Sequence, residues 1–327
     1  MVSGQILSRS GDRPGAAIDP GSVRNPAGTP TWSSSPRQPQ THSRPFPRGS
    51  GARRLYVYKS LPDESGAHPD LVYNISDGAW DNALWGDTFV PAGNRTLLVW
   101  KTLPLDGKAA DVTFNGQVGT TSFRRFSGVA LDDRYLYASD PDSQKIHVFR
   151  GIPSATDAPA FSLDLPDAAR LDSDGTWLVV TRTTTNSAPV IVYRVADLAA
   201  GATGATVPFS RVRPNLPQYA AVHEGRLFVG DTTNNRVLSW TRMEDALAGR
   251  DPDLVLGTSD LSSAPQARIG KNTFFWPGAP VFDGRYLWVG EFKFSERLLR
   301  FGGFGAAGRD GAQLRRPRGR GPSLHHC

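Results

Sequence analysis

Residues 221–240 read AVHEGRLFVGDTTNNRVLSW and carry the clearest structural signal in the chain. Two runs rich in β-branched and aromatic residues, RLFVG at 226–230 and RVLSW at 236–240, flank DTTNN, whose residue types favour turns. The stretch therefore predicts a β-hairpin.

The second strand of this hairpin recurs along the chain as a basic or small residue, several apolar residues and a closing aromatic. The closing aromatics are Tyr58, Trp100, Phe149, Tyr193, Trp240 and Phe301, spaced 42 to 61 residues apart. The first strand recurs as RYLYASD at 134–140, TWLVVT at 176–181, RLFVGD at 226–231 and RYLWVGE at 285–291, with a weaker ALWGD at 83–87. Repeats of this length built from short strands are typical of a β-propeller.

We therefore expect an all-β chain, a β-propeller of four-stranded antiparallel blades. Six closing strands favour six blades, with five as the alternative. The first unit lacks clear inner strands and the last lacks its outer strand, which leaves the closure of the ring open.

The units resemble NHL repeats, in particular a bacterial variety in which the hairpin is followed by a short apolar segment and a strand of the form Pro-Asp-Leu-Val-Leu-Gly. The matching segments are SLPDESGAHPDLVY at 60–73, TLPLDGKAADVTFNGQ at 102–117 and ALAGRDPDLVLG at 246–257. The resemblance covers about residues 54–301. It implies the fold and leaves the activity open, because such propellers serve as binding platforms and as enzyme scaffolds.

Both ends of the chain differ from this repeat region. Residues 1–53 hold eight prolines and seven glycines without a hydrophobic period, so we expect a disordered tail, and likewise for residues 302–327. The two tails carry charges of +5 and +4, which leaves −3 for residues 54–301. Arginine-rich tails could bind nucleic acid. We favour solvated ends or out-of-frame translation, since the tails lack interleaved aromatics and the repeat breaks off abruptly.

The sequence fixes no cellular compartment. The first residues lack the apolar stretch of a signal peptide, although relatives in the NHL resemblance are often exported. No segment reaches the roughly 20 apolar residues of a membrane span. The single cysteine, Cys327, excludes a disulfide framework and a cysteine zinc site within the chain.

Four acids are the candidate metal ligands, because we place them at the same repeat position at the end of the second strand: Asp87, Asp140, Asp231 and Glu291. A ring of carboxylates could hold calcium in the channel, as in gluconolactonase-like propellers. The alternative is that each acid accepts hydrogen bonds from the N–H groups of its own turn. We favour this structural interpretation and expect no cofactor.

Aromatic residues and one histidine are the candidate ligand contacts: Phe274, Phe275, Trp276, Trp80, Trp85 and His223. The first three follow a long insertion near residues 259–273, and loops of that length often carry binding residues. His223 is the one histidine beside an inner strand, whereas a zinc lyase on such a propeller would need three. No nucleophile or phosphate-binding motif is present.

These observations favour a monomeric, non-catalytic binding scaffold for a protein, peptide or glycan. The alternative is a calcium- or zinc-dependent lyase or hydrolase that acts on a small molecule in the central channel. The acidic balance of residues 54–301 argues against nucleic acid as the partner.

Overall fold

The structure is a computed structural model. It describes residues 54–59, 68–75, 77–78, 80–185, 187–210, 212–258, 261–262, 264–270, 273–291 and 297–302. Apart from Gly302, the two predicted tails lie outside these residues, so their disorder stays a prediction.

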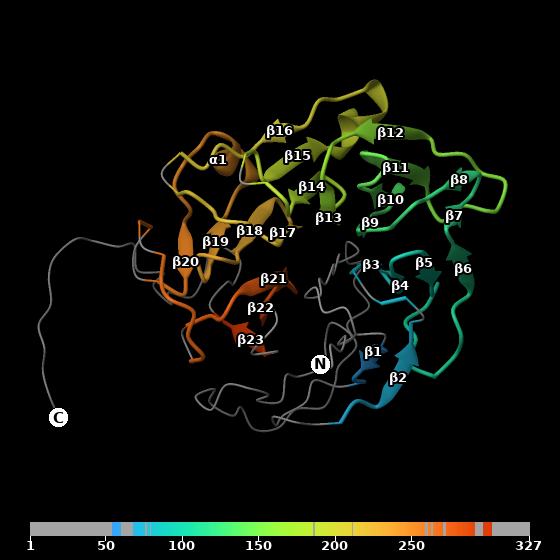
Figure 1. Cartoon of the computed structure of the whole chain (residues 1–327), viewed down its shortest axis with the longest axis horizontal. Helices are drawn as coiled ribbons and strands as arrows, with labels where there is room; N and C mark the ends of the chain where they lie inside the picture. The colour runs from blue at the N-terminus through green and yellow to red at the C-terminus, as the bar shows by residue number, and fades with distance from the viewer. Residues whose placement is uncertain are drawn as a thin grey trace, which may run out of the picture.

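Five consecutive antiparallel sheets form the blades of a propeller (Figure 1). Blade one comprises β3 (Asp81–Trp85), β4 (Thr88–Ala92), β5 (Thr96–Val99) and β6 (Val112–Asn115), and blade two comprises β9 (Gly128–Leu131), β10 (Tyr135–Asp140), β11 (Lys145–Arg150) and β12 (Phe161–Asp164). Blade three comprises β13 (Ala168–Ser173), β14 (Trp177–Arg182), β15 (Val190–Arg194) and β16 (Ala205–Thr206). Blade four comprises β17 (Tyr219–His223), β18 (Arg226–Asp231), β19 (Arg236–Trp240) and β20 (Leu254–Leu256), and blade five comprises β21 (Pro277–Phe282), β22 (Leu287–Glu291) and β23 (Leu298–Phe301).

The predicted propeller with four-stranded antiparallel blades is confirmed, and the blade count is five, the alternative count, instead of six. Strands follow one another from the inner to the outer edge of each blade. The first strands of successive blades contact each other in chain order, so they surround the axis of the ring.

The elements outside the blades are small. A two-stranded sheet of β1 (Arg54–Val57) and β2 (Leu71–Asn74) precedes blade one, and β7 (Gln117–Val118) pairs with β8 (Thr121–Ser122) between blades one and two. The helices among the described residues are the 3-10 helix η1 (Val195–Ala200) and α1 (Met243–Leu247).

The stretch that predicts the hairpin forms β17 through β19. Asp231 at the end of β18 is the register partner of Arg236 at the start of β19, and DTTNN makes the turn between them. Asn235 adopts a φ of 51°, a backbone conformation that asparagine tolerates better than most residues.

The hydrophobic core lies between the blades. Each of four apolar clusters joins two neighbouring blades, and a fifth joins β1 and β2 to blade one. Trp240, 1% exposed, packs between blades three and four, and its indole N–H donates to the carbonyl of Arg250 at 2.8 Å. Stacking the apolar faces of neighbouring sheets thus buries both sides of blades one to four.

Candidate binding surface

Turns within blades and connections between blades lie together on one face of the propeller. In an antiparallel meander, the turns between second and third strands lie at the same end as the connections from one blade to the next. We call this end the upper face.

Three of the four predicted metal ligands are buried at the end of a second strand and bind the chain that enters their own blade. Asp140 accepts from the backbone N–H of Arg124 at 3.0 Å, and Asp231 accepts from that of Asn215 at 2.7 Å. Glu291 accepts from that of Phe275 at 2.8 Å. The three carboxylates therefore anchor the connections to the turns. The expected hydrogen bonds from the backbone N–H groups of the acid's own turn are seen for Asp140, which accepts from Asp142 and Ser143.

Two of these acids also contact arginines. Asp231 lies 2.7 Å from the Nε of Arg236, and Glu291 lies 2.7 Å from both Nε and Nη2 of Arg297. Burial raises the pKa of the Asp231 carboxyl, while the hydrogen bonds from Asn215, Asn234 and Arg236 oppose that rise.

The repeat position assigned to Asp87 is wrong. Asp87 lies exposed in the turn between β3 and β4, because residues 81–85 form the innermost strand of blade one and not its second strand. In blade three, Thr181 holds the acid's place, and its hydroxyl accepts from the N–H of Ala220 at 2.8 Å. Within the described residues, no three histidine, cysteine, aspartate or glutamate side chains form a group suited to a metal.

The aromatic segment after the insertion divides into two parts. Phe274 is buried in the core between blades four and five and lies 5.6 Å from Phe301, so its role is packing. Phe275 and Trp276 are partly exposed, with ring centroids 6.0 Å apart. Trp276 has a φ of 54° and donates its N–H to Asn235. A ligand role for these two residues stays a prediction.

The other three ligand candidates do not join that segment. Trp85 packs against the core between blades one and two, whereas His223 lies at the end of β17 and its ring meets Phe282 edge-on at 5.1 Å. Burial lowers the pKa of His223, and its Nε2 is buried without a hydrogen bond. Trp80 lies beneath the guanidinium of Arg170 at 5.8 Å. The structure thus does not bring the six candidates together in one site.

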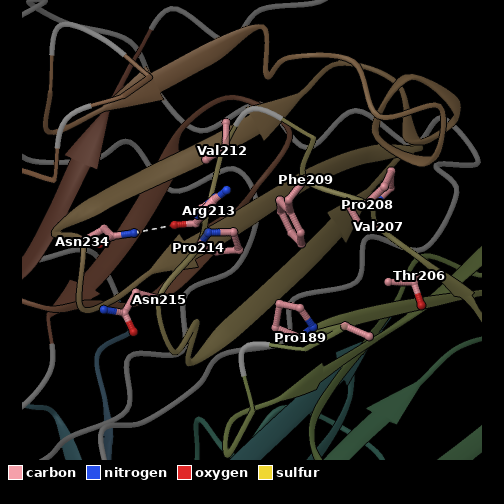
Figure 2. A pocket seen from close by; sticks show the side chains of 11 residues that line it. Pro189, Thr206, Val207, Pro208, Phe209, Val212, Arg213, Pro214, Asn215 and Asn234 are labelled. Carbon is pink, nitrogen blue, oxygen red and sulfur yellow. Dashed lines mark hydrogen bonds between the residues drawn. The ribbon is translucent and has the colours of Figure 1, made fainter.

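A groove on the upper face was not predicted. It has a volume of about 560 Å³ and lies between the third and fourth blades (Figure 2). Its walls come from the segment before β15, the end of β16, the connection to blade four and the turn after β18; its residues are Ala188, Pro189, Thr206, Val207, Pro208, Phe209, Val212, Arg213, Pro214, Asn215 and Asn234.

One wall of the groove is hydrogen-bonded to Asp231, the buried acid at the end of the second strand of blade four. The side-chain amide of Asn234 donates to the carbonyl of Arg213 at 2.9 Å, drawn as a dashed line in Figure 2, and to Asp231 at 3.0 Å. The ring of Phe209 packs edge-on against Trp240 at 5.9 Å. Hydrogen bonds thus join one wall of the groove to the turn between β18 and β19, and the other wall packs against the core between blades three and four.

The backbone of the connection is strained. Phe209 and Leu216 adopt φ values of 45° and 47°. Bulky side chains rarely occupy this region, and such a conformation costs about 1–3 kcal/mol. Residues with such strained backbone conformations cluster at binding sites, where contacts with the surrounding structure maintain the conformation. The one sequence signal was the density of prolines, with Pro208, Pro214 and Pro217 in a segment without strand periodicity.

Comparisons with known proteins identify no family for this chain. No protein-family model matches the chain, and no curated protein sequence matches it. Among solved structures, a chain of the nidogen/laminin complex is 14% identical, with 66% of this chain and 72% of that chain covered and a TM-score of 0.45. The WD40 repeats of RRP9 are 14% identical over 66% of this chain and 62% of theirs, with a TM-score of 0.40. The computationally designed Ika4 protein is 10% identical over 54% and 90%, with a TM-score of 0.35.

The class of protein is therefore defined by the chain's own architecture, which is that of a β-propeller. Among the described residues, no helix is both long and apolar enough to cross a membrane.

Proposed function

We propose that the chain is a non-catalytic, NHL-like binding scaffold whose groove between blades three and four holds a peptide that presents an apolar side chain beside a carboxylate. The groove itself carries this proposal. Its volume of about 560 Å³ falls within the usual range for ligand sites, which is roughly 300–1,000 Å³.

The lining supports an apolar anchor. Four of the lining side chains are proline or phenylalanine, and valines complete the floor. Val207 and Val212 belong to the core between blades three and four, so the floor is continuous with that core. A peptide side chain placed there would leave water for an apolar surface, the dominant favourable term in association.

The charge at the rim supports a carboxylate. Arg213 is exposed, and no ion pair joins its guanidinium to any described acid. The nearby carboxylate of Asp231 is already occupied by Arg236 and by the two asparagines of the rim. An acidic group on the ligand would therefore meet an available positive charge.

The groove is also prepared for binding. The hydrogen bonds of Asn234 and the packing of Phe209 on Trp240 hold the walls in place before a ligand arrives. A fixed site loses less conformational entropy on association, and this raises affinity.

The NHL-like character rests on blade four. The hairpin of β18 and β19 is followed by the short helix α1 and then by β20, in the order that the sequence resemblance implies. The segment ALAGRDPDLVLG spans the end of this helix and the whole of β20.

Selection from a phage-displayed library of random 12-residue peptides tests the proposal. The full chain is immobilised, and the dissociation constants of the enriched peptides are measured by fluorescence polarisation. We expect enrichment of peptides with an aromatic or aliphatic residue next to Asp or Glu. The variant Arg213→Glu should weaken their binding at least tenfold, as should Thr206→Trp, which adds bulk to the groove.

The matched control is Arg134→Glu, the same charge reversal in the exposed turn between β9 and β10, at the opposite end of the blades. It should change affinity less than twofold. The proposal fails if no peptide is enriched on the wild-type chain. It also fails if the enriched peptides bind wild type, Arg213→Glu and Thr206→Trp equally, or if a glycan array yields the specific ligand instead.

A further inference from the structure

We propose that the peptide held by the groove adds to the outer edge of blade three as an antiparallel strand beside β16, with an acidic residue directly before its apolar anchor. This placement rests on the proposed function. It adds a backbone partner for the peptide, a direction for its chain and an order for its two recognised residues.

The outer edge of β16 is open to solvent. β16 is the last strand of blade three and lies at the rim of the propeller in Figure 1, and both of its residues are exposed. The outer strands of the other four-stranded blades, β6, β12 and β20, each contain partly or fully buried residues. Backbone groups along an exposed sheet edge are a template for an added strand.

The backbone of Thr206 points outward from the blade. Val207 donates its N–H to the carbonyl of Val190 at 3.1 Å, and Ile191 is the register partner of Thr206. In an antiparallel pair, hydrogen-bonded positions alternate with positions whose N–H and C=O groups point away from the partner strand. Thr206 therefore presents one donor and one acceptor to the open edge, and a peptide residue placed opposite can bond to both.

A strand added at this edge directs a side chain into the groove. Directly opposed residues of neighbouring strands carry their side chains on the same face of the sheet. Val207 belongs to the core between blades three and four, so a peptide residue opposite Val207 points toward blade four. Val207 and Val212 also line the groove. The apolar anchor is therefore the peptide residue next to the one that pairs with Thr206.

The pairing ends on the side where the positive charge lies. Pro208 follows Val207 and has no backbone N–H, so the added ladder stops there. In Figure 2, Phe209 lies between Pro208 and Arg213, so a peptide that continues past the end of the ladder approaches the exposed guanidinium of Arg213. A carboxylate at that point of the peptide meets an opposite charge.

The direction of the peptide fixes the order of its residues. Every strand pair of blade three is antiparallel, and antiparallel pairs are the commoner kind in proteins. A peptide antiparallel to β16 passes Arg213 first, then Val207 and then Thr206. The acid therefore precedes the apolar anchor in its sequence.

The test uses the synthetic peptide acetyl-SEFTVSG-amide, whose phenylalanine is placed opposite Val207 and whose threonine is placed opposite Thr206. Calorimetry measures its affinity for the full chain, and NMR follows hydrogen exchange at the amide of Thr206. We expect saturable binding and exchange at Thr206 slowed about tenfold or more. The reversed peptide acetyl-GSVTFES-amide, in which the acid follows the anchor, should bind about tenfold more weakly or worse.

Methylation of the peptide backbone separates strand addition from simple occupation of the groove. A methyl group on the threonine nitrogen removes the N–H that faces Thr206. It should weaken binding about tenfold or more, because the carbonyl of Thr206 then loses its donor. A methyl group on the valine nitrogen is the matched control. That nitrogen faces solvent in the added strand, so affinity should change less than about threefold.

Two variants of the chain test the same edge. Thr206→Pro removes the outward N–H but keeps the bonds of the flanking residues to β15, and proline is tolerated where the N–H of an edge strand faces solvent. It should weaken SEFTVSG about tenfold, whereas Thr206→Val, which keeps the N–H, should change affinity less than about twofold. The melting temperatures of both variants show whether the fold is retained.

The outcomes distinguish strand addition from the groove itself. Equal affinities of the two methylated peptides overturn strand addition, and if Arg213→Glu still weakens both, the groove remains a peptide site. Absence of SEFTVSG binding also overturns strand addition, while the groove is judged by the library selection. Equal affinities of the forward and reversed peptides overturn the residue order. Slow exchange at Thr206 in the free chain overturns the proposal as well, because another segment or a second copy would then hold the edge.

Discussion

Asp231 accepts a hydrogen bond from the backbone N–H of Asn215 across 2.7 Å, and this contact fastens the wall of the groove to the turn of blade four. The same carboxylate accepts from Arg236, whose side chain is almost fully buried. Asp140 accepts only from backbone N–H groups, those of Arg124, Asp142 and Ser143. The two acids occupy the same repeat position but should respond differently to substitution.

We predict that Asp140→Asn is mild and that Asp140→Ala lowers the free energy of unfolding by about 1–2 kcal/mol. An amide oxygen still accepts from backbone N–H groups, whereas alanine leaves them without an acceptor. Urea unfolding of both variants gives the comparison. Equal losses for asparagine and alanine would show that the negative charge itself matters at this position.

Asp231→Asn should cost more, about 3 kcal/mol, because it leaves the buried guanidinium of Arg236 without its anion. The double variant Asp231→Asn with Arg236→Gln should recover part of that loss. A double-mutant cycle in urea measures the coupling. A coupling near zero would mean that Arg236 is held by contacts other than Asp231, such as the carbonyl of Leu261, to which its Nη1 donates at 2.7 Å.

Trp240→Ala should lower the free energy of unfolding by about 3–5 kcal/mol, the range for a large buried aromatic. The indole fills the core between blades three and four, and its N–H is paired with Arg250. Trp240→Phe should be milder. Because Phe209 packs against this indole ring, the alanine variant should also weaken the binding of peptides in the groove. A loss below about 1 kcal/mol would contradict the packing described for this strand.

The stability of the chain should depend on pH through Asp81. Burial raises the pKa of this carboxyl to about 7, against the opposing influence of Arg170 and of three backbone N–H groups. The folded state thus holds a proton that the unfolded state releases near pH 4, so this group favours folding at low pH. Its contribution is lost as the pH rises from about 4 to 7, by up to about 4 kcal/mol.

Asp81→Asn should remove this dependence, and the difference between the two chains in urea at pH 5 and pH 8 measures it. The comparison is needed because buried His223, whose pKa is lowered, acts in the opposite direction below about pH 6.5. If both chains show the same change with pH, then Asp81 is ionised in the fold throughout.

Removal of residues 1–53 and 303–327 should leave cooperative unfolding nearly unchanged, because neither segment has a core-forming pattern. Differential scanning calorimetry of the shortened and full chains gives the comparison. A fall of the melting temperature by more than about 5 °C would show that one of these segments completes the ring.

The sequence predicted the hairpins well, because alternation, turn residues and closing aromatics are local signals. Blades two to five follow the runs read from the sequence closely. Blade one did not, since ALWGD at 83–87 resembles a second strand while its residues belong to the innermost strand and the turn after it. A short apolar run does not reveal its place in a sheet, which depends on partners far along the chain.

The candidate surface was harder to predict for the same reason. The run FFWPG suggests a single aromatic cluster, yet Phe274 packs inward while Phe275 and Trp276 remain partly exposed. The groove joins the segment before β15 to the turn after β18, two regions more than forty residues apart. No local pattern links Pro189 to Asn234; their proximity follows from how neighbouring blades stack.

Asp140, Asp231 and Glu291, which anchor the connections between blades, bear on how the sequence of the upper face can change. Each holds the entering chain through one backbone N–H group, which any residue except proline can supply. The residues of a connection that pack against no blade are therefore free to vary in sequence while the blades beneath stay the same. A library of inserted sequences at 259–270 should yield folded proteins with new specificities, in the way that antibody loops diversify on a constant framework.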